Sequence, residues 1–265
     1  MAQEEKLPDI GKIPIFDSHF HIIDQRFPLV PNDGYLPDEF SCRDYLKRTA
    51  KLAVCGGAVI SGSFQALDQS YLIDAISVLG PAFVGVTQLP ASVSDQEVLR
   101  LNELGVRAIR FNLKRGGSEQ VGQLERLARR VHEIARWHVE LYLDSRELVG
   151  LKGILAGLPA VSIDHLGLAK EGFASLLSLV EKGARVKATG FSRVDFDVKA
   201  ALREICAANP GALMFGTDLP STRAPRPFAE GDLLLVLEAL GEERARQVFY
   251  DNAVALYRPR RVQEY

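Results

Sequence analysis

The sequence predicts a single-domain α/β protein folded as a TIM (β/α)8 barrel, and three features support this. Short apolar segments and helix-like segments alternate about eight times along the chain, which favours a parallel sheet covered by helices. No change of composition marks a second domain, and 265 residues suit one such barrel. A doubly wound open sheet is the alternative that the same alternation allows.

The strands are expected where short apolar runs are bounded by turn residues. They are assigned to residues 13–21, 53–61, 82–89, 106–113, 138–144, 160–165, 184–190 and 212–217. The barrel is therefore expected over residues 13–257, with an N-terminal tail over 1–12 and a polar C-terminal tail over 258–265.

The helices follow the strands in turn, and 121–137 has the clearest apolar spacing of three and four residues. Ser41 and Ser94 stand where N-caps are expected. The predicted helices are 41–51, 70–79, 94–103, 121–137, 147–156, 173–180, 198–207, 231–240 and 242–257. Residues 26–40 are rich in Pro, Gly, Asn and Asp, so we expect a long loop that covers the pocket.

The composition narrows the class of protein. Hydrophobic residues make up 47% and the net charge is −2 with both signs interspersed, so a nucleic-acid partner is not expected. The three cysteines, Cys42, Cys55 and Cys206, form no close pair, which indicates a reducing compartment. No signal peptide or membrane-spanning run is expected, and the predicted location is the cytoplasm.

Polar residues gather where the predicted strands end, and barrel enzymes place their sites at that rim. In the first strand, alternation is expected to put Ile13, Ile15, Asp17, His19 and His21 on one face. The sixth strand is expected to put His165 on the face of Val161 and Ile163. The other strands end in Arg110 and Asn112, in Lys187 and Thr189 followed by Arg193, and in Asp218.

These segments resemble the amidohydrolase superfamily, and within it the amidohydrolase-2 branch that contains the 2-pyrone-4,6-dicarboxylate lactonases. The resemblance rests on the order and spacing of residues 16–21, 105–112, 163–167, 187–190, 215–220 and 251–257. It covers nearly the whole chain. His-x-His alone is a weak signal, but its combination with Asp-His and Gly-Thr-Asp is specific.

The resemblance implies a TIM barrel that hydrolyses a bond at a carbonyl. It assigns Asp218 as the general base for water, and His19, His21 and His165 as the groups that polarise the carbonyl and hold the oxyanion. Two structural alternatives stay open. Asp218 would cap a helix that begins at Leu219, or His165 would be an ordinary core histidine.

The metal expectation follows from departures from the superfamily. Many members carry Lys or Glu after strand four and His after strand five, whereas this chain has Arg110, Asn112 and Tyr142 there. We therefore expect catalysis without a cofactor. The alternative is one divalent ion, Zn or Mn, held by His19, His21 and Asp218, with His165 nearby.

The expected substrate is a small carboxylated molecule. By resemblance, Arg110 and Arg193 match positions that bind substrate carboxylates, and a planar guanidinium suits that task. A basic loop at Lys114 and Arg115 adds charge, and we expect the hydroxyls of Tyr35, Ser61, Ser63 and Tyr142 to add hydrogen bonds. The alternative is that each arginine pairs with a protein carboxylate. Leu168 replaces an arginine of the lactonases, which favours a monocarboxylate or a differently placed second acid.

The leading function is a hydrolase that opens a carboxylated lactone such as 2-pyrone-4,6-dicarboxylate, in aromatic-compound catabolism. One alternative is a metal-dependent decarboxylase of a related amidohydrolase branch. The other is a non-catalytic carboxylate-binding barrel. The sequence leaves the oligomeric state open.

Overall fold

Eight parallel strands form the central sheet of the computed structural model, which describes residues 10–262. Neighbouring strands pair in chain order from β1 to β8, and backbone hydrogen bonds from the residues after β8 to the end of β1 close the ring. This confirms the predicted barrel and excludes the open sheet. The strands are β1 Ile15–Phe20, β2 Val54–Ile60, β3 Phe83–Thr87, β4 Val106–Asn112, β5 His138–Tyr142, β6 Val161–Ile163, β7 Arg185–Ala188 and β8 Leu213–Phe215.

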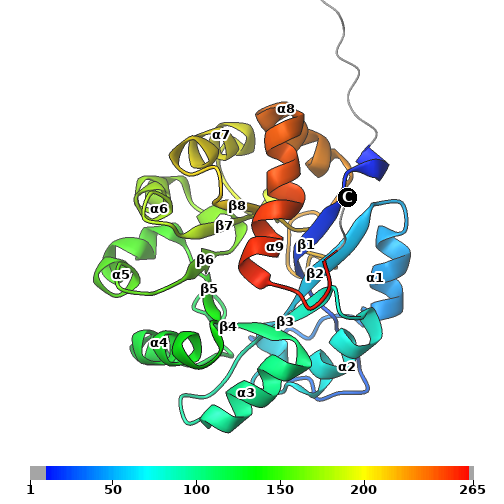
Figure 1. The fold of residues 1–265 in the computed structure, drawn as a ribbon, viewed down its shortest axis with the longest axis vertical. Coiled ribbons are helices and arrows are strands. Elements are labelled where there is room, and N and C mark those ends of the chain that lie inside the picture. The colour runs from blue at the N-terminus through cyan, green and yellow to red at the C-terminus, as the bar shows by residue number, and fades with distance from the viewer. Residues whose placement is uncertain (1–9, 263–265) are drawn as a thin grey trace, which may run out of the picture.

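A ring of helices surrounds the barrel (Figure 1). They are α1 Cys42–Thr49, α2 Ser70–Leu79, α3 Asp95–Leu104, α4 Leu124–Ala135, α5 Leu148–Leu155, α6 Phe173–Val180, α7 Val198–Ala208, α8 Gly231–Arg246 and α9 Asn252–Tyr257. The caps predicted at Ser41 and Ser94 are confirmed, since each side chain accepts a hydrogen bond from the helix backbone. Helix α4 is shorter than predicted because a 3-10 turn precedes it and Arg136 adopts a left-handed conformation after it.

The C-terminal helices close the end of the barrel opposite to the site. The chain bends at Gly241 (φ 74°) within α8, passes through a π-helical turn, Gln247–Asp251, and ends in α9. Tyr257 stacks on Phe16 of β1 with ring centroids 5.5 Å apart. In Figure 1, α9 crosses the middle of the barrel. With this end plugged by apolar and aromatic side chains, the opposite rim is left for the site.

The first strand departs from the predicted alternation. Ile15 packs in the outer core and Asp17 accepts a hydrogen bond from Tyr45 of α1, whereas His19 contacts Lys187 inside the barrel. A register shift between Asp17 and Phe20 breaks the period of two. The prediction that all odd positions share one face was therefore wrong.

The sixth strand corrects a second expectation. Val161 and Ile163 pack in the outer core, but His165 does not share their face, because the strand ends first and His165 adopts a left-handed conformation (φ 51°). Polar residues are also not confined to strand ends. Glu140 in the middle of β5 and Lys187 within β7 are fully buried inside the barrel.

Two further expectations concern chain ends and helix caps. Residues 1–9 and 263–265, which belong to the predicted tails, lie outside the described residues, and Ile10–Lys12 forms a 3-10 turn before β1. In the described part of the chain no helix begins at Leu219, so Asp218 is not a helix cap. Within residues 10–262, no helix combines the length and apolar character needed to cross a bilayer.

Candidate active site

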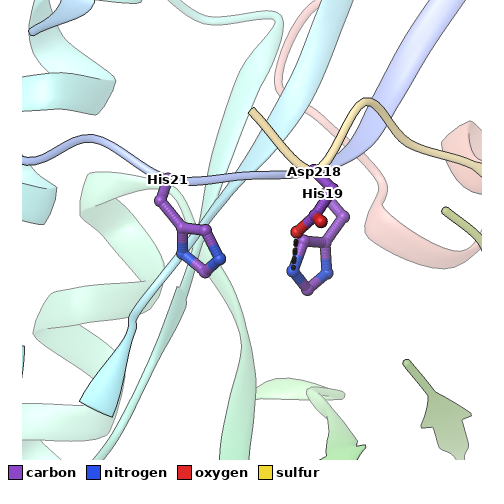
Figure 2. Close-up of side chains that lie close together, drawn as sticks. All are labelled: His19, His21 and Asp218. Carbon is purple, nitrogen blue, oxygen red and sulfur yellow. Dashed lines mark ion pairs between the residues drawn. The ribbon is translucent and has the colours of Figure 1, made fainter. Parts of the chain in front are cut away.

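The centre of the site is formed by His19, His21 and Asp218, which come from the adjoining ends of β1 and β8 (Figure 2). Two backbone hydrogen bonds of 2.7 Å tie these ends together, from Asp218 N to the oxygen of His19 and from His21 N to the oxygen of Leu219. A Cβ atom at Gly216 would lie 2.8 Å from Cβ of His19, so only glycine allows β8 to approach β1 this closely. His19 Nε2 lies 3.9 Å from Asp218 Oδ1.

His165 completes the cluster from the turn after β6. Its Nε2 lies 4.0 Å from Asp218 Oδ1, and its ring centroid lies 4.8 Å from that of His19 and 5.1 Å from that of Tyr142. All four predicted central residues therefore meet at one point. His165 Nδ1, His19 Nε2 and Asp218 Oδ1 are buried without a hydrogen-bond partner among the described residues. Such atoms are the ones that a substrate or water would satisfy.

Burial sets the protonation of the cluster. It raises the pKa of Asp218 to about 6, although the neighbouring Arg193 guanidinium acts in the opposite direction. Burial also lowers the pKa of His21 to about 3 and holds those of His19 and His165 well below their usual values. At neutral pH the site therefore contains an ionised carboxylate and three uncharged imidazoles.

A pocket that is open to solvent lies beside this cluster. Its wall combines aromatic rings, hydroxyl groups and four guanidinium groups. Of the residues predicted to bind substrate, Arg110, Arg193, Tyr35, Ser63 and Tyr142 line it, together with His21, Gly62, Phe64, Asn112, Arg115, His165, Asp218, Thr222 and Arg223. Ser61, Lys114 and the fully buried His19 do not line it. The Ser61 hydroxyl lies 2.6 Å from Tyr71 OH of α2, and Lys114 Nζ lies 3.3 Å from Asp144 Oδ2.

Two of the guanidinium groups are already paired. Arg110 donates to Asp164 Oδ2 at 2.8 Å and to the Ser61 carbonyl at 2.6 Å. Arg110 is therefore paired with a barrel carboxylate, which is the alternative that the sequence left open. Arg193 donates through Nε to Asp218 Oδ2 at 2.8 Å and through Nη2 to the Thr222 carbonyl at 2.8 Å.

The other two guanidinium groups lie at the pocket mouth. Within residues 10–262 the Arg115 side chain makes no hydrogen bond, although its carbonyl accepts one from Asn32. Arg223 covers the ring of Tyr35 at 4.4 Å and donates to Asn32, which holds the predicted 26–40 loop against the pocket. The sequence did not predict Arg223 as a pocket residue, because it follows the end of β8 by several residues and belongs to no recognisable motif.

The spacing of the cluster is compatible with one divalent ion. His19, His21 and Asp218 each offer a ligand atom, and these atoms lie within 4.8 Å of one another. The His21 ring nitrogen Nδ1 lies 2.7 Å from the Ile60 carbonyl, and donation there leaves Nε2 free to bind a metal. A second group with suitable spacing is formed by His19, Asp164 and His165.

A (β/α)8 barrel that gathers histidines and an aspartate at the carboxyl ends of its strands, beside a basic pocket, has the organisation of a barrel hydrolase. The chain belongs to the amidohydrolase family, whose model matches residues 16–258. This confirms the resemblance seen in the sequence and shows that the protein is a hydrolase rather than a non-catalytic binding barrel.

The relatives of this chain include proteins named as hydrolases of a pyrone and of a lactone. The chain is 25% identical over 277 residues to the 2-pyrone-4,6-dicarboxylate hydrolase of Comamonas testosteroni, covering 93% of this chain and 90% of that one. It is 25% identical over 271 residues to the 4-sulfomuconolactone hydrolase of Rhizobium radiobacter, covering 91% and 89%. A solved Pseudomonas putida structure, proposed to be a 2-pyrone-4,6-dicarboxylic acid hydrolase, is 26% identical, with a TM-score of 0.78 over 95% of this chain and 99% of that one.

Proposed function

We propose that the protein opens a lactone that carries carboxylate groups, such as 2-pyrone-4,6-dicarboxylate, by water attack on the ester carbonyl. One observation carries the proposal. A buried, unpartnered oxygen of Asp218 lies 3.9–4.0 Å from the Nε2 atoms of His19 and His165, beside a pocket with four guanidinium groups. A water molecule that lies beside these atoms can reach Asp218 Oδ1 and one Nε2 group within hydrogen-bond distance.

In this mechanism Asp218 is the general base. It takes a proton from water as the water oxygen bonds to the lactone carbonyl carbon, and a pKa of about 6 keeps it ionised at neutral pH. The carbonyl oxygen then carries the developing negative charge, which N–H groups of His19 or His165 stabilise, whereas His21 already donates its N–H to the Ile60 carbonyl. When the ring C–O bond breaks, protonated Asp218 returns its proton to the leaving oxygen, so the base is regenerated.

The substrate's acid groups would bind the arginines. Arg193 is placed to bind one carboxylate next to the reacting carbonyl, with help from Tyr142. Arg115 has unused donors and suits a second acid group at the mouth, beside Tyr35. This would replace the arginine that the lactonases carry at the position of Leu168. Arg110 contributes less because both of its terminal nitrogens already donate, one to Asp164 and one to the Ser61 carbonyl, whereas Arg193 donates through Nε and one terminal nitrogen.

We propose that the reaction needs no cofactor and belongs to the cytoplasmic breakdown of aromatic compounds. The free thiols of Cys42 and Cys206 are consistent with a reducing compartment. If Zn or Mn binds, His19, His21 and Asp218 would hold it, and the ion would supply polarisation of the carbonyl.

The test is the loss of pyrone absorbance when chelator-treated protein is mixed with 2-pyrone-4,6-dicarboxylate, with 4-sulfomuconolactone as a second anionic lactone. We expect turnover by the chelated protein and none by Asp218→Asn, which keeps the side-chain shape but removes the base. Turnover by Asp218→Asn would contradict the assigned base. Release of CO2 from an aromatic carboxylic acid only after zinc or manganese is added would instead support the decarboxylase.

A further inference from the structure

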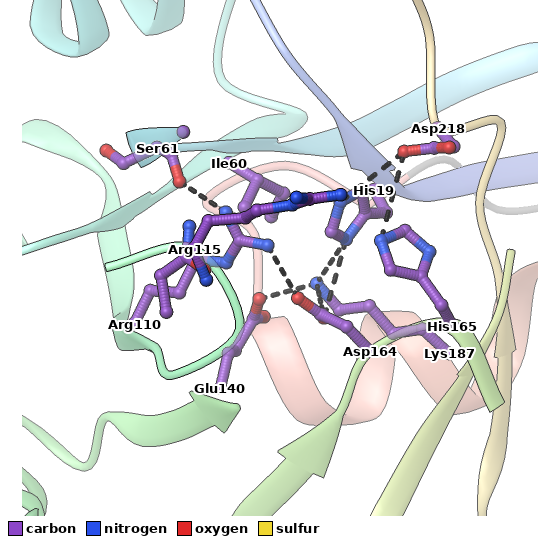
Figure 3. Close-up of polar contacts among 12 residues, drawn as sticks. His19, Ile60, Ser61, Arg110, Arg115, Glu140, Asp164, His165, Lys187 and Asp218 are labelled. Carbon is purple, nitrogen blue, oxygen red and sulfur yellow. Dashed lines mark hydrogen bonds and ion pairs between the residues drawn. The ribbon is translucent and has the colours of Figure 1, made fainter. Parts of the chain in front are cut away.

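Lys187 lies beneath the site and is in contact with His19 (Figure 3). It comes from β7 and is fully buried. Its Nζ lies 2.5 Å from Glu140 Oε2, 3.2 Å from His19 Nδ1 and 3.5 Å from Asp164 Oδ1. An ammonium group only donates, so Lys187 donates hydrogen bonds to Glu140 and to His19, while Asp164 Oδ1 lies at ion-pair distance.

The surrounding charges are consistent with an ammonium group at Lys187. Glu140 also accepts hydrogen bonds from Tyr257 and lies 3.1 Å from His138 Nε2, while Asp164 pairs with Arg110. Two buried carboxylates are thus balanced by the cations of Lys187 and Arg110. Loss of either cation would leave a buried carboxylate without its partner, which is strongly unfavourable.

The hydrogen bond from Lys187 determines which nitrogen of His19 carries the proton. Because Nζ only donates, His19 Nδ1 must accept, and the proton of the neutral ring is then on Nε2. Asp164 Oδ1 is the competing partner, since it would accept from an Nδ1–H group. It lies farther away, at 3.5 Å, whereas Lys187 Nζ lies 3.2 Å from the same nitrogen.

We propose that Lys187 is a positioning residue that holds His19 in its Nε2–H form, so that His19 donates to the substrate carbonyl and does not bind a metal. This rests on the proposed lactone hydrolysis for the donor's role. A ring nitrogen that carries a proton has no lone pair for a metal ion. His21 has the opposite arrangement, because its Nδ1 donates to the Ile60 carbonyl. The two histidines of the His-x-His motif thus carry opposite tautomers.

Protonation of both nitrogens of His19 is disfavoured in this environment. Burial lowers the pKa of His19 well below its ordinary value, and the positive charge of Lys187 acts in the same direction, while Asp164 opposes them. The ring is therefore neutral near pH 7, and the question is only which nitrogen bears the proton.

The direct test is a long-range 1H–15N NMR spectrum of the chelator-treated full chain labelled with 15N-histidine at pH 7. His19→Asn and His21→Asn spectra assign the two rings. We expect the Nε2–H form for His19 and the Nδ1–H form for His21. An Nδ1–H form of His19 would overturn the proposal. The spectrum needs no substrate, so it stays decisive even if no lactone is hydrolysed.

Zinc affinity gives a second readout. In Lys187→Met the donor is lost, Asp164 becomes the partner of His19, and His19 Nε2 is free to bind zinc. We expect zinc to bind about 10–100-fold more tightly, the usual range for a changed partner of a metal-binding histidine. Glu140→Gln is the matched control, because it disturbs the same buried group but keeps the Lys187–His19 contact, and its zinc affinity should stay at the wild-type value.

Two outcomes of the zinc titration contradict the proposal. One is an unchanged zinc affinity in folded Lys187→Met, and the other is an equal rise in Glu140→Gln, which would show a merely structural effect. If Lys187→Met does not fold, the spectrum of the wild-type protein decides by itself.

Discussion

The pH dependence of hydrolysis should depend on Arg193, because Arg193 is the cation that contacts the proposed base. Burial raises the pKa of Asp218 to about 6, and Arg193 limits this rise through a contact of 2.8 Å between its Nε and Asp218 Oδ2. A general base works only when it is deprotonated. In the wild-type protein kcat/KM should therefore be half-maximal near pH 6 and fall about tenfold for each pH unit below it.

Replacing Arg193 by methionine should move this midpoint upward. An adjacent opposite charge lowers a carboxyl pKa by about 1–3 units, each worth about 1.4 kcal/mol. Without Arg193 the midpoint should lie between about pH 7 and about pH 9. The loss of kcat/KM should accordingly be larger at pH 6 than at pH 9, where only the lost substrate contact would persist.

The assay is kcat/KM against pH for chelator-treated protein, with the uncatalysed hydrolysis of the lactone subtracted at each pH. Arg115→Met is the matched control, because Arg115 lines the same pocket but makes no contact with Asp218. The Arg115→Met substitution should lower kcat/KM by the same factor at every pH. A midpoint that stays near pH 6 in Arg193→Met would refute Asp218 as the titrating base.

Three further predictions concern stability, measured by urea unfolding followed by circular dichroism. Asp164→Asn should lower the free energy of unfolding by about 3–5 kcal/mol, because Arg110 and Lys187 each lose a buried carboxylate partner; an unchanged midpoint would show that the buried charges are not coupled. Trp137→Ala should cost about 3–5 kcal/mol by leaving a cavity at a fully buried position, and a loss under 1 kcal/mol, roughly a surface-site effect, would contradict that burial. Ser41→Ala should cost about 1 kcal/mol through loss of the α1 cap, with no change in kcat/KM.

The sequence was sufficient for the architecture because the barrel depends on local patterns. Apolar runs of strand length alternate with segments of helical period, and each of these properties is carried by neighbours in the chain. Caps such as Ser41 and Ser94 are also local, since the side chain bonds to backbone three residues away. The ends of strands were therefore predictable, and with them His19, His21 and Asp218.

The sequence was less informative about strand faces, because one irregularity reverses every later side chain. The register shift between Asp17 and Phe20 turns His19 into the barrel although Asp17 faces α1. The left-handed conformation of His165 has a similar effect after β6. Neither feature is marked by residue type, since no glycine stands at these positions.

The partners of each charged residue were decided only by the tertiary structure. Sequence resemblance indicated Arg110 as a carboxylate-binding residue, but only the folded barrel shows that Asp164, 54 positions later, already binds it. In the same way Lys187 and His19 are 168 positions apart in sequence. They meet because the barrel closes, which leaves only β8 between β7 and β1.

The sequence by itself thus determined the barrel, the rim on which the site lies and the residue types at its centre. Only the tertiary structure decided which donors remain free for substrate and which are used within the protein. The physical reason is that hydrophobic periodicity and helix capping act over a few neighbouring residues. Charge pairing in a barrel interior instead joins residues that are distant in sequence, and the low polarity there makes an unpaired charge strongly unfavourable.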